Sequence, residues 1–330
     1  MGAELARQVA VRFDELDRRI VGALQVDGRA SWHRIAHVLG EQERTVTRRG
    51  TQLIRSGLVR ITGLTLRAEG VIVGLRCAPG QARLAGGALA RRDDAMFTHV
   101  LTGSTDCIAE ISCPSEHLAS LVMDELPATP GMVESFTQPV LRYIRTAHEW
   151  HPGLITDDER AALEESAPLP RQRHFGDTED LPKQDKLLVA ALAEDARRTY
   201  EELARLTGLS EATVRRHLDR LRRDGRVLIR AVVEPAQVGL PIEAMLWVRT
   251  SPADVDDAAE GLRESPYVRY ASRLCGDWQF LINATLPTPK ALDDFVSRAP
   301  WAKRVQHVET SMVLCTLKRS GVLAPPSSGR

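Results

Sequence analysis

Two stretches of this chain have equal length and closely similar patterns: LDRRIVGALQVDGRASWHRIAHVLG from Leu16 to Gly40, and QDKLLVAALAEDARRTYEELARLTG from Gln184 to Gly208. When Asp17 is aligned with Asp185, the match continues without a gap for 45 residues, of which 17 are identical. This similarity indicates an internal duplication with an offset of 168 residues. A period this long with only two copies is not that of a solenoid.

In the second copy, helix start and stop signals predict three helices followed by a strand. Apolar residues recur at helical spacing from Leu187 to Leu192. The capping box Thr199-Tyr-Glu-Glu202 starts a second helix, which Gly208 ends. Ser210 caps a third helix, which ends at Gly225 before the β-branched run VLIRAVV. The residues expected to face inward are Leu187, Leu188, Ala191, Leu192, Leu203, Leu206, Val214, Leu218 and Leu221.

This order of elements is typical of a winged helix-turn-helix. The first copy repeats it: Val46, Leu53 and Ile54 form the inner face of its third helix, Gly57 ends that helix, and LVRITGLTL supplies the wing strand. The duplication therefore predicts two winged helix-turn-helix units, which we name A (residues 12–66) and A′ (residues 182–236).

Arginine is concentrated around the third helix of each unit. Five Arg and one acidic residue lie from Glu43 to Arg60, and seven Arg and three acidic residues lie from Glu211 to Arg230. Whole-chain charge gives no such signal, because 44 basic residues balance 44 acidic ones. A helix fits the major groove, where Arg reads guanine and neutralises phosphates; the alternative is an ordinary solvated face. We expect DNA contacts from Arg44, Thr47, Arg48, Thr51, Ser210, Thr213, Arg215, Arg216 and Arg220.

A second repeated unit follows each helix-turn-helix. LTGSTDCIAEISC (Leu101 to Cys113) lies over LCGDWQFLINATL (Leu274 to Leu286) at an offset of 173. Each unit reads as strand, helix, strand, strand, helix, strand, which is the ferredoxin-like βαββαβ order. We name these units B (residues 67–147) and B′ (residues 237–320), joined by a linker at residues 148–181 in which Thr156-Asp-Asp-Glu159 starts a short helix to about Glu165. The fold class is thus α+β, with both domain types duplicated.

One strand pattern predicts how the sheets are covered. Cys107, Ala109 and Ile111 share one apolar face, whereas the other face is only half apolar, with Ile108 beside Glu110. Helices cover one side of such a sheet, so we expect a second sheet to pack on the half-apolar side. From the same faces we expect chains to associate further into a homo-oligomer.

At these residues the chain resembles the leucine-responsive/asparagine-responsive (Lrp/AsnC) transcription regulators. LDRRIVGALQVDGRAS resembles that family's first helix and D-G-R turn, and GLSEATVRRHLDRLRRDGRV its recognition helix. Gly103-Ser-Thr-Asp106 resembles the family's G-x-x-D turn. The resemblance implies dimeric binding of palindromic operators, assembly through B-type domains, and a small effector, often an amino acid, near that turn. The implied effector residues are Gly103, Thr105, Asp106, Gly276 and Gln279.

Departures from the pattern predict unequal copies. Unit A lacks the serine cap that A′ has at Ser210, and Gly50 stands in its third helix where A′ has Leu218. Glycine inside a helix costs about 1 kcal/mol relative to alanine, so we expect A to read DNA less well. Gln279 stands where the family has Asp, so an effector ammonium group is expected to favour Asp106 in B.

Two other functions remain open. Siroheme decarboxylases share this architecture, and His99 and His307 could be cast as haem ligands, although ordinary sheet-surface histidines explain them better. A Soret band in pure protein would favour the enzyme. Alternatively, the helix-turn-helix units are vestigial and the protein only assembles, in which case it would not retard DNA at low salt.

We expect no enzyme activity, cofactor or metal site. The spacing of His148, His151 and His174 fits no standard ligand pattern. All five cysteines lie in or beside apolar runs, so we expect buried, reduced thiols. No apolar run approaches the ~20 residues of a membrane helix, and we expect a cytoplasmic protein without a membrane partner.

Overall fold

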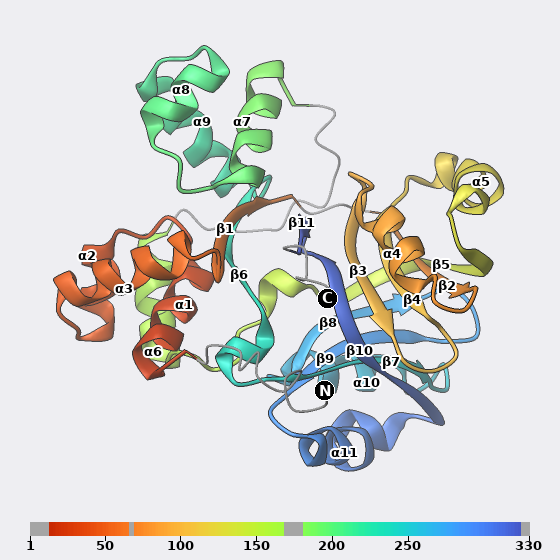
Figure 1. Cartoon of the computed structure of the whole chain (residues 1–330). Helices are drawn as coiled ribbons and strands as arrows, with labels where there is room; N and C mark the ends of the chain where they lie inside the picture. Colours follow the sequence, from red (N-terminus) through yellow and green to blue (C-terminus); the bar gives the residue numbers. More distant parts are fainter. Residues whose placement is uncertain (1–12, 66–68, 168–180, 325–330) are drawn as a thin grey trace, which may run out of the picture. The chain divides into compact units, whose positions relative to one another are not determined.

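The computed structural model describes residues 13–65, 69–167 and 181–324 of the chain (Figure 1). They form two compact units. The helical unit contains the described residues of Met1–Ala68 and His151–Gly239, and the sheet unit those of Glu69–Trp150 and Leu240–Arg330. Each copy of the helix-turn-helix therefore groups with the other copy, and so do the two βαββαβ domains.

The helical unit contains the two predicted winged helix-turn-helix domains. The second helix of each ends at a glycine in the left-handed conformation, Gly40 with φ of 66° and Gly208 with φ of 71°. The elements are α1 (Glu15–Val26), α2 (Trp32–Leu39), α3 (Glu43–Arg55) and β1 (Val59–Leu64) in A, and α7 (Lys183–Glu194), α8 (Tyr200–Thr207), α9 (Glu211–Arg223) and β6 (Leu228–Val233) in A′, followed by the 3₁₀ turn η6 (Pro235–Val238).

The two wing strands pair with each other. The sequence predicted one such strand in each copy; in the structure β1 and β6 form a two-stranded antiparallel sheet shared by A and A′ (Figure 1). Thr62 lies opposite Arg230 in this ribbon. Because these two residues are equivalent in the duplication, 168 positions apart, the ribbon relates A and A′ by a pseudo-two-fold axis.

The linker helix α6 (Asp157–Ser166) begins at the predicted capping box and packs against α1 and α2 of unit A. Leu163 of this helix is buried, and Glu159 of the same helix pairs with Arg19 at 2.6 Å. The equivalent face of A′ has no such cover among the described residues. This explains why two inward predictions were wrong: Leu187 and Leu206 are 42% and 52% exposed.

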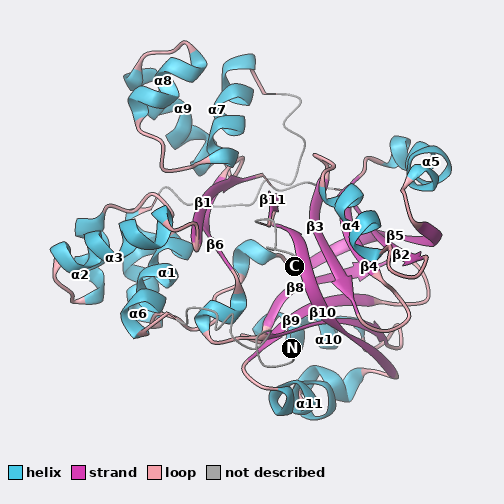
Figure 2. Ribbon diagram, in the orientation of Figure 1, coloured by secondary structure: helices cyan, strands magenta, loops and turns pink. Residues whose placement is uncertain are grey.

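In the sheet unit both copies have the predicted βαββαβ order (Figure 2). B contains β2 (Gly70–Cys77), α4 (Ala82–Ala90), β3 (Ala95–Leu101), β4 (Cys107–Ser112), a helical segment made of η2 (Ser115–His117), α5 (Leu118–Ser120), η3 (Leu121–Glu125) and η4 (Leu126–Ala128), β5 (Met132–Arg145) and η5 (Ala147–Glu149). B′ contains β7 (Ile242–Arg249), α10 (Val255–Glu264), β8 (Val268–Leu274), β9 (Phe280–Leu286), α11 (Pro289–Arg298), η7 (Pro300–Arg304), β10 (His307–Arg319) and β11 (Val322–Leu323).

Two long strands join the copies. β5 pairs with β2 of its own domain up to Pro139 and with β8 of B′ from Val140 onward. β10 pairs in the same way, first with β7 and then with β3 of B. The pairings are symmetric at an offset of 173, since Val140 faces Leu274 and Val313 faces Leu101. B and B′ are therefore one closed β structure.

Three apolar clusters fill this unit. α4 and the segment after β4 cover one face of the B sheet, and α10 and α11 cover the corresponding face of B′. The third cluster combines Ile72, Phe97 and Ile108 of B with Trp247 and Leu281 of B′. It confirms that the half-apolar faces pack on a second sheet. The second sheet belongs to the same chain, so these faces are not available for association between chains.

A buried carboxyl lies between the two sheets. Glu110 Oε1 accepts hydrogen bonds from Tyr143 at 2.6 Å and from Tyr270 at 3.2 Å. Burial raises the pKa of Glu110 to about 7, which the two tyrosine hydroxyls only partly oppose. The unfolded chain should ionise near the ordinary value of 4.5. The protonated form is therefore favoured by folding, and ionisation destabilises the fold.

We predict that Glu110 lowers stability as pH rises. Its contribution is most favourable below about pH 4.5 and is lost as pH rises through about 7, because only the folded state then holds the proton. Urea unfolding measures the free energy of unfolding at pH 5 and at pH 7.5. Between these two pH values it should fall by about 1–3 kcal/mol more for the wild type than for Glu110→Gln. Glu134→Gln, at an exposed position on β5, is the control. Parallel pH profiles for wild type and Glu110→Gln would contradict this assignment.

Candidate functional site: DNA-reading helices and effector turns

The third helices α3 and α9 carry the predicted DNA contacts. Ser210 caps α9 by accepting the Thr213 N–H at 3.2 Å, whereas Gln42 at the start of α3 makes no side-chain cap. The predicted inner residues Val46, Leu53, Val214, Leu218 and Leu221 are buried. Arg44, Arg48, Arg215 and Arg216 are exposed, and Thr47, Thr51 and Thr213 are half-buried.

Part of the Arg-rich surface serves the fold instead. Arg49 pairs with Asp14 and with Asp17 of α1. Arg222 is buried, and its guanidinium lies 2.7 Å from Asp27 in the turn of the other copy. Counting Arg along the sequence therefore overstated the charge available to DNA.

Arg220, one of the predicted DNA contacts, is also engaged. Its guanidinium lies 2.5 Å from the fully buried Asp185 of α7, which also contacts His217 Nδ1 at 2.6 Å. The Arg220 side chain remains 50% exposed. Arg215 is held differently, since its guanidinium lies over the Tyr200 ring at 4.6 Å from the centroid. Cation–π packing of this kind orients the side chain without neutralising it.

Two further arginines, which the sequence analysis did not assign, join A to A′. Arg29 donates to the carbonyls of Ala196 and Arg198 in the other copy at 2.6 and 3.0 Å. Its equivalent, Arg197, donates to the Ala30 carbonyl at 2.6 Å.

Each of these guanidiniums also lies over an aromatic ring of the other copy, Arg29 over Tyr200 and Arg197 over Trp32. In the sequence, these arginines could have been singled out because the D-x-R turn is identical in both copies. These crossed contacts and the β1–β6 ribbon fix the two helix-turn-helix units to each other.

Gly50 has a packing role inside α3. A Cβ added there would lie 2.3 Å from the Trp32 ring, closer than atoms can approach. A′ has Tyr200 and Leu218 at the equivalent positions. The same site is therefore packed by Trp32 and Gly50 in A and by Tyr200 and Leu218 in A′. The glycine leaves space for the larger ring.

The two effector turns share one structural role. Asp106 Oδ2 accepts the backbone N–H of Cys77 at 2.8 Å. Gln279 Oε1 accepts the N–H of Thr250, the equivalent of Cys77, at 3.0 Å. Both side chains therefore brace their turn against the end of the neighbouring strand. A neutral amide oxygen suffices for this, which accounts for Gln279 without any ligand.

The rest of the turns is mostly accessible. Gly103 and Gly276 are exposed in the left-handed region, with φ of 97° and 128°, whereas Thr105 is buried. Ser104 donates to Glu309 of β10 at 2.5 Å. In B′, the ring of Trp278 packs on Trp247 and lies beneath the Arg249 guanidinium. B′ thus places an aromatic residue where B has Thr105.

The two histidines considered as haem ligands lie in different surroundings. His99 is 2% exposed, stacks on Phe97, and makes a 3.0 Å hydrogen bond from Nδ1 to Thr316 Oγ1. Burial lowers the pKa of His99 to about 3. His307 is exposed beside Trp278, with ring centroids 5.6 Å apart.

Other expectations for the chain had mixed outcomes. Within the described ranges, no group of His, Cys, Asp and Glu has the arrangement of a metal site, and no helix is long and apolar enough to cross a membrane. His174 lies outside the described residues. Cys107 and Cys113 are buried as expected, but Cys275 is exposed, because it lies in the turn after β8.

Family models match both kinds of domain. An AsnC-type helix-turn-helix domain matches residues 13–54, a winged helix-turn-helix DNA-binding domain residues 181–227, and an Lrp/AsnC ligand binding domain residues 243–323. The class is therefore a winged helix-turn-helix DNA-binding protein with ligand-binding domains. The chain belongs to the Lrp/AsnC family of transcription regulators.

Each of two individual relatives aligns with less than half of this chain, over nearly all of its own length. An uncharacterised HTH-type transcriptional regulator of Pyrococcus furiosus is 29% identical over 43% of this chain and 96% of its own length. The HTH-type transcriptional regulator FL11 of Pyrococcus horikoshii is 23% identical over 41% of this chain and 91% of its own length.

The structure of the siroheme decarboxylase NirDL matches with a TM-score of 0.58 over 93% of both chains, at 11% identity. At this identity the likeness establishes a shared fold only.

Proposed function

We propose that one chain binds an operator with two inverted half-sites, one for each recognition helix, and that an amino-acid-like effector controls this binding. The observation that carries the proposal is the pseudo-two-fold pairing of A and A′, in which β1 pairs with β6 and Arg29 and Arg197 cross between copies. A palindromic operator matches such symmetry. Exposed Arg residues on both α3 and α9 supply the charge and donors that DNA requires.

The half-sites are proposed to differ in sequence. Arg48 and Arg216 are equivalent and both exposed, so they should make the same contact in each half-site. The neighbouring positions differ, with Arg44 matched by Ala212 and Thr47 by Arg215. An imperfect palindrome fits this pair of surfaces, and the capped α9 with Arg215 beside Arg216 is the stronger reader.

We predict that Arg215→Ala and Arg216→Ala each weaken DNA binding. The loss should be about 1–3 kcal/mol if the residue reads a base, or the salt slope should fall by about one if it contacts phosphate. Genomic fragments are selected with the wild type, and affinities are measured at several salt concentrations. Arg263→Ala on α10 removes the same charge outside the helix-turn-helix and is the control. The assignment fails if the α9 variants behave like this control.

The effector is proposed to lie near the exposed turn Gly103–Asp106, with the equivalent turn Gly276–Gln279 as a weaker site. Asp106 supplies a carboxyl group there, and one of its oxygens braces the turn. Charge-assisted hydrogen bonds are roughly twice as strong as neutral ones. An ammonium-bearing effector should therefore prefer B over B′.

We predict that Asp106→Asn separates the two roles of this side chain. Asparagine keeps an oxygen for the Cys77 N–H, as Gln279 does for Thr250, so folding should be unchanged. Calorimetry with a panel of L-amino acids should show about tenfold weaker binding than wild type, which corresponds to about 1.4 kcal/mol. Asp277→Asn, in the turn of B′, is the matched control. Undiminished binding to Asp106→Asn would leave its carboxylate with a structural role alone.

We propose that chains associate through the exposed apolar side chains of β5 and β10. Leu141 and Leu314 occupy equivalent bulged positions on these strands and are 59% and 64% exposed. Such exposed apolar side chains would contribute to a contact surface if two chains brought them together.

The double variant Leu141→Asp, Leu314→Asp is predicted to shift the light-scattering mass at micromolar concentration to that of one chain. Leu84→Asp, equally apolar and exposed on α4, should leave the mass unchanged. The same mass for the double variant and the wild type would place the interface elsewhere.

We also propose that the protein is not a siroheme decarboxylase. Shared fold does not carry shared chemistry. His99 is packed between sheets against Phe97 and Thr316, so it reaches a tetrapyrrole only if the core opens. The DNA-binding surface, by contrast, needs no rearrangement of its exposed arginines.

A further inference from the structure

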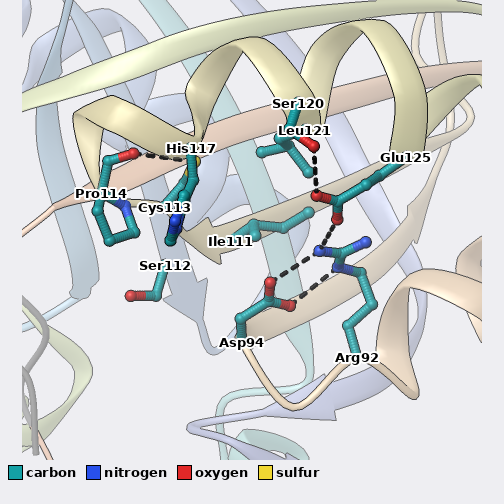
Figure 3. Close-up of a pocket in the computed structure, with 10 residues that line it drawn as sticks. All are labelled: Arg92, Asp94, Ile111, Ser112, Cys113, Pro114, His117, Ser120, Leu121 and Glu125. Atoms are coloured by element: carbon teal, nitrogen blue, oxygen red, sulfur yellow. Dashed lines mark hydrogen bonds and ion pairs between the residues drawn. The ribbon is translucent and has the colours of Figure 1, made fainter. Parts of the chain in front are cut away.

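A hollow of about 330 Å³ lies in B, away from the turn of Asp106. Its walls come from the loop between α4 and β3, the end of β4, and the helical segment η2 to η3 (Figure 3). Ile111, Leu121 and Cys113 form the apolar part of its floor and are themselves buried. Ser112, His117 and Ser120 add polar groups to the lining. Its volume is at the lower end of small-molecule sites.

Two carboxylates and one guanidinium form one wall. Figure 3 shows Asp94 and Glu125 directed at Arg92, with His117 on the opposite side. Arg92 donates to both oxygens of Asp94 at 2.9 and 2.8 Å, and to Glu125 at 2.6 Å. Asp94, Glu125 and Arg92 together have a formal net charge of −1. Each carboxylate retains acceptor capacity, because a carboxylate oxygen can accept two hydrogen bonds.

The second copy has different residues at the equivalent place, with aromatic rings packed beside them. At the offset of 173, Asp94 becomes Tyr267, Cys113 becomes Leu286 and Glu125 becomes Arg298. The Tyr267 ring packs edge-on against Phe295, which packs against the fully buried Trp301. Filling such space with rings gains dispersion contacts that an open hollow forgoes. B instead keeps the space open and lines it with charge.

The helix that lines the hollow is also irregular only in B. Leu121–Glu125 forms a π-helical turn, whereas the equivalent residues 294–298 lie in the regular α11. π turns in α-helices are rare and occur often at functional sites. This turn contributes both Leu121 to the floor and Glu125 to the charged wall. The irregularity and the unfilled space thus coincide.

We propose that this hollow binds a small organic cation, a primary ammonium or guanidinium group carried on a short apolar body. The excess of carboxylate acceptors favours a positively charged donor, and the Nε and Nη2 groups of Arg92 already donate to Asp94 and Glu125. Ion pairs in such a partly enclosed site are stronger than in open water. The apolar floor takes the body of the ligand. This is a second ligand site, independent of the effector turn and of DNA.

Three isosteric probes test the charge preference: n-butylammonium, butyrate and n-butanol. Each is titrated without DNA into the ¹⁵N-labelled full chain. Butylammonium should shift the amide signals of Ser112, Cys113 and Leu121 in a saturable way, and butyrate should not. The equivalent Thr285 and Leu286 of B′ should not move. Saturable binding of butyrate equal to that of butylammonium would overturn the proposal.

Variants test the residues. Glu125→Gln should weaken butylammonium binding at least tenfold, and Arg298→Gln, at the equivalent position of B′, should leave it unchanged. If Glu125→Gln perturbs the Arg92 cluster, Ser112→Leu fills the hollow without touching an ion pair and should abolish binding. Unchanged binding in both Glu125→Gln and Ser112→Leu would show that the hollow is not the site. Since no DNA is present, the result is independent of the proposed regulatory function.

Discussion

The structure depends on strands that belong to two copies at once. β5 and β10 each complete the sheet of their own domain and then continue into that of the other, where they cover the edge strands β8 and β3. An unpaired sheet edge exposes a row of backbone donors and acceptors and invites association. Exchange of β5 and β10 satisfies both edges within one chain and encloses the core that contains Glu110.

The same principle operates in the helical unit on a smaller scale. A single strand is not stable alone, and among the residues that the structure describes β1 and β6 pair only with each other. Arg29 and Arg197 then add hydrogen bonds to carbonyls and contacts with rings across the axis. The mutual orientation of the two helices α3 and α9 is therefore a property of the pair, and the proposal of a symmetric DNA target is based on it.

Fusion of the copies has allowed equivalent positions to diverge while the shared geometry remained. Asp106 and Gln279 brace the same turn with different chemistry, and Trp32 with Gly50 replaces Tyr200 with Leu218. Two separate identical chains would have to carry one choice at both places. The two copies have also diverged at the hollow. B lines it with charged side chains, B′ has aromatic packing at the equivalent place, and the proposed cation site is in B.

Local pattern in the sequence determined the elements and much of the candidate site. Helical spacing, the capping box at Thr199 and the glycines at 40 and 208 specify the helix-turn-helix, because each acts through neighbours within one turn. The exposed Arg48 and Arg216 follow from the same periodicity. Strand alternation likewise predicted that the face bearing Ile108 would be covered.

Only the tertiary structure decided which residues meet across long sequence distances. Arg222 was counted in the positive charge around the third helix, but it lies buried against Asp27. One oxygen of Asp106 accepts the backbone N–H of Cys77. The pairing of β1 with β6 and the hollow beside Arg92 are equally nonlocal. The sequence determines the charge of a side chain and its position in a periodic pattern. The residue that this side chain contacts is determined by how distant segments pack.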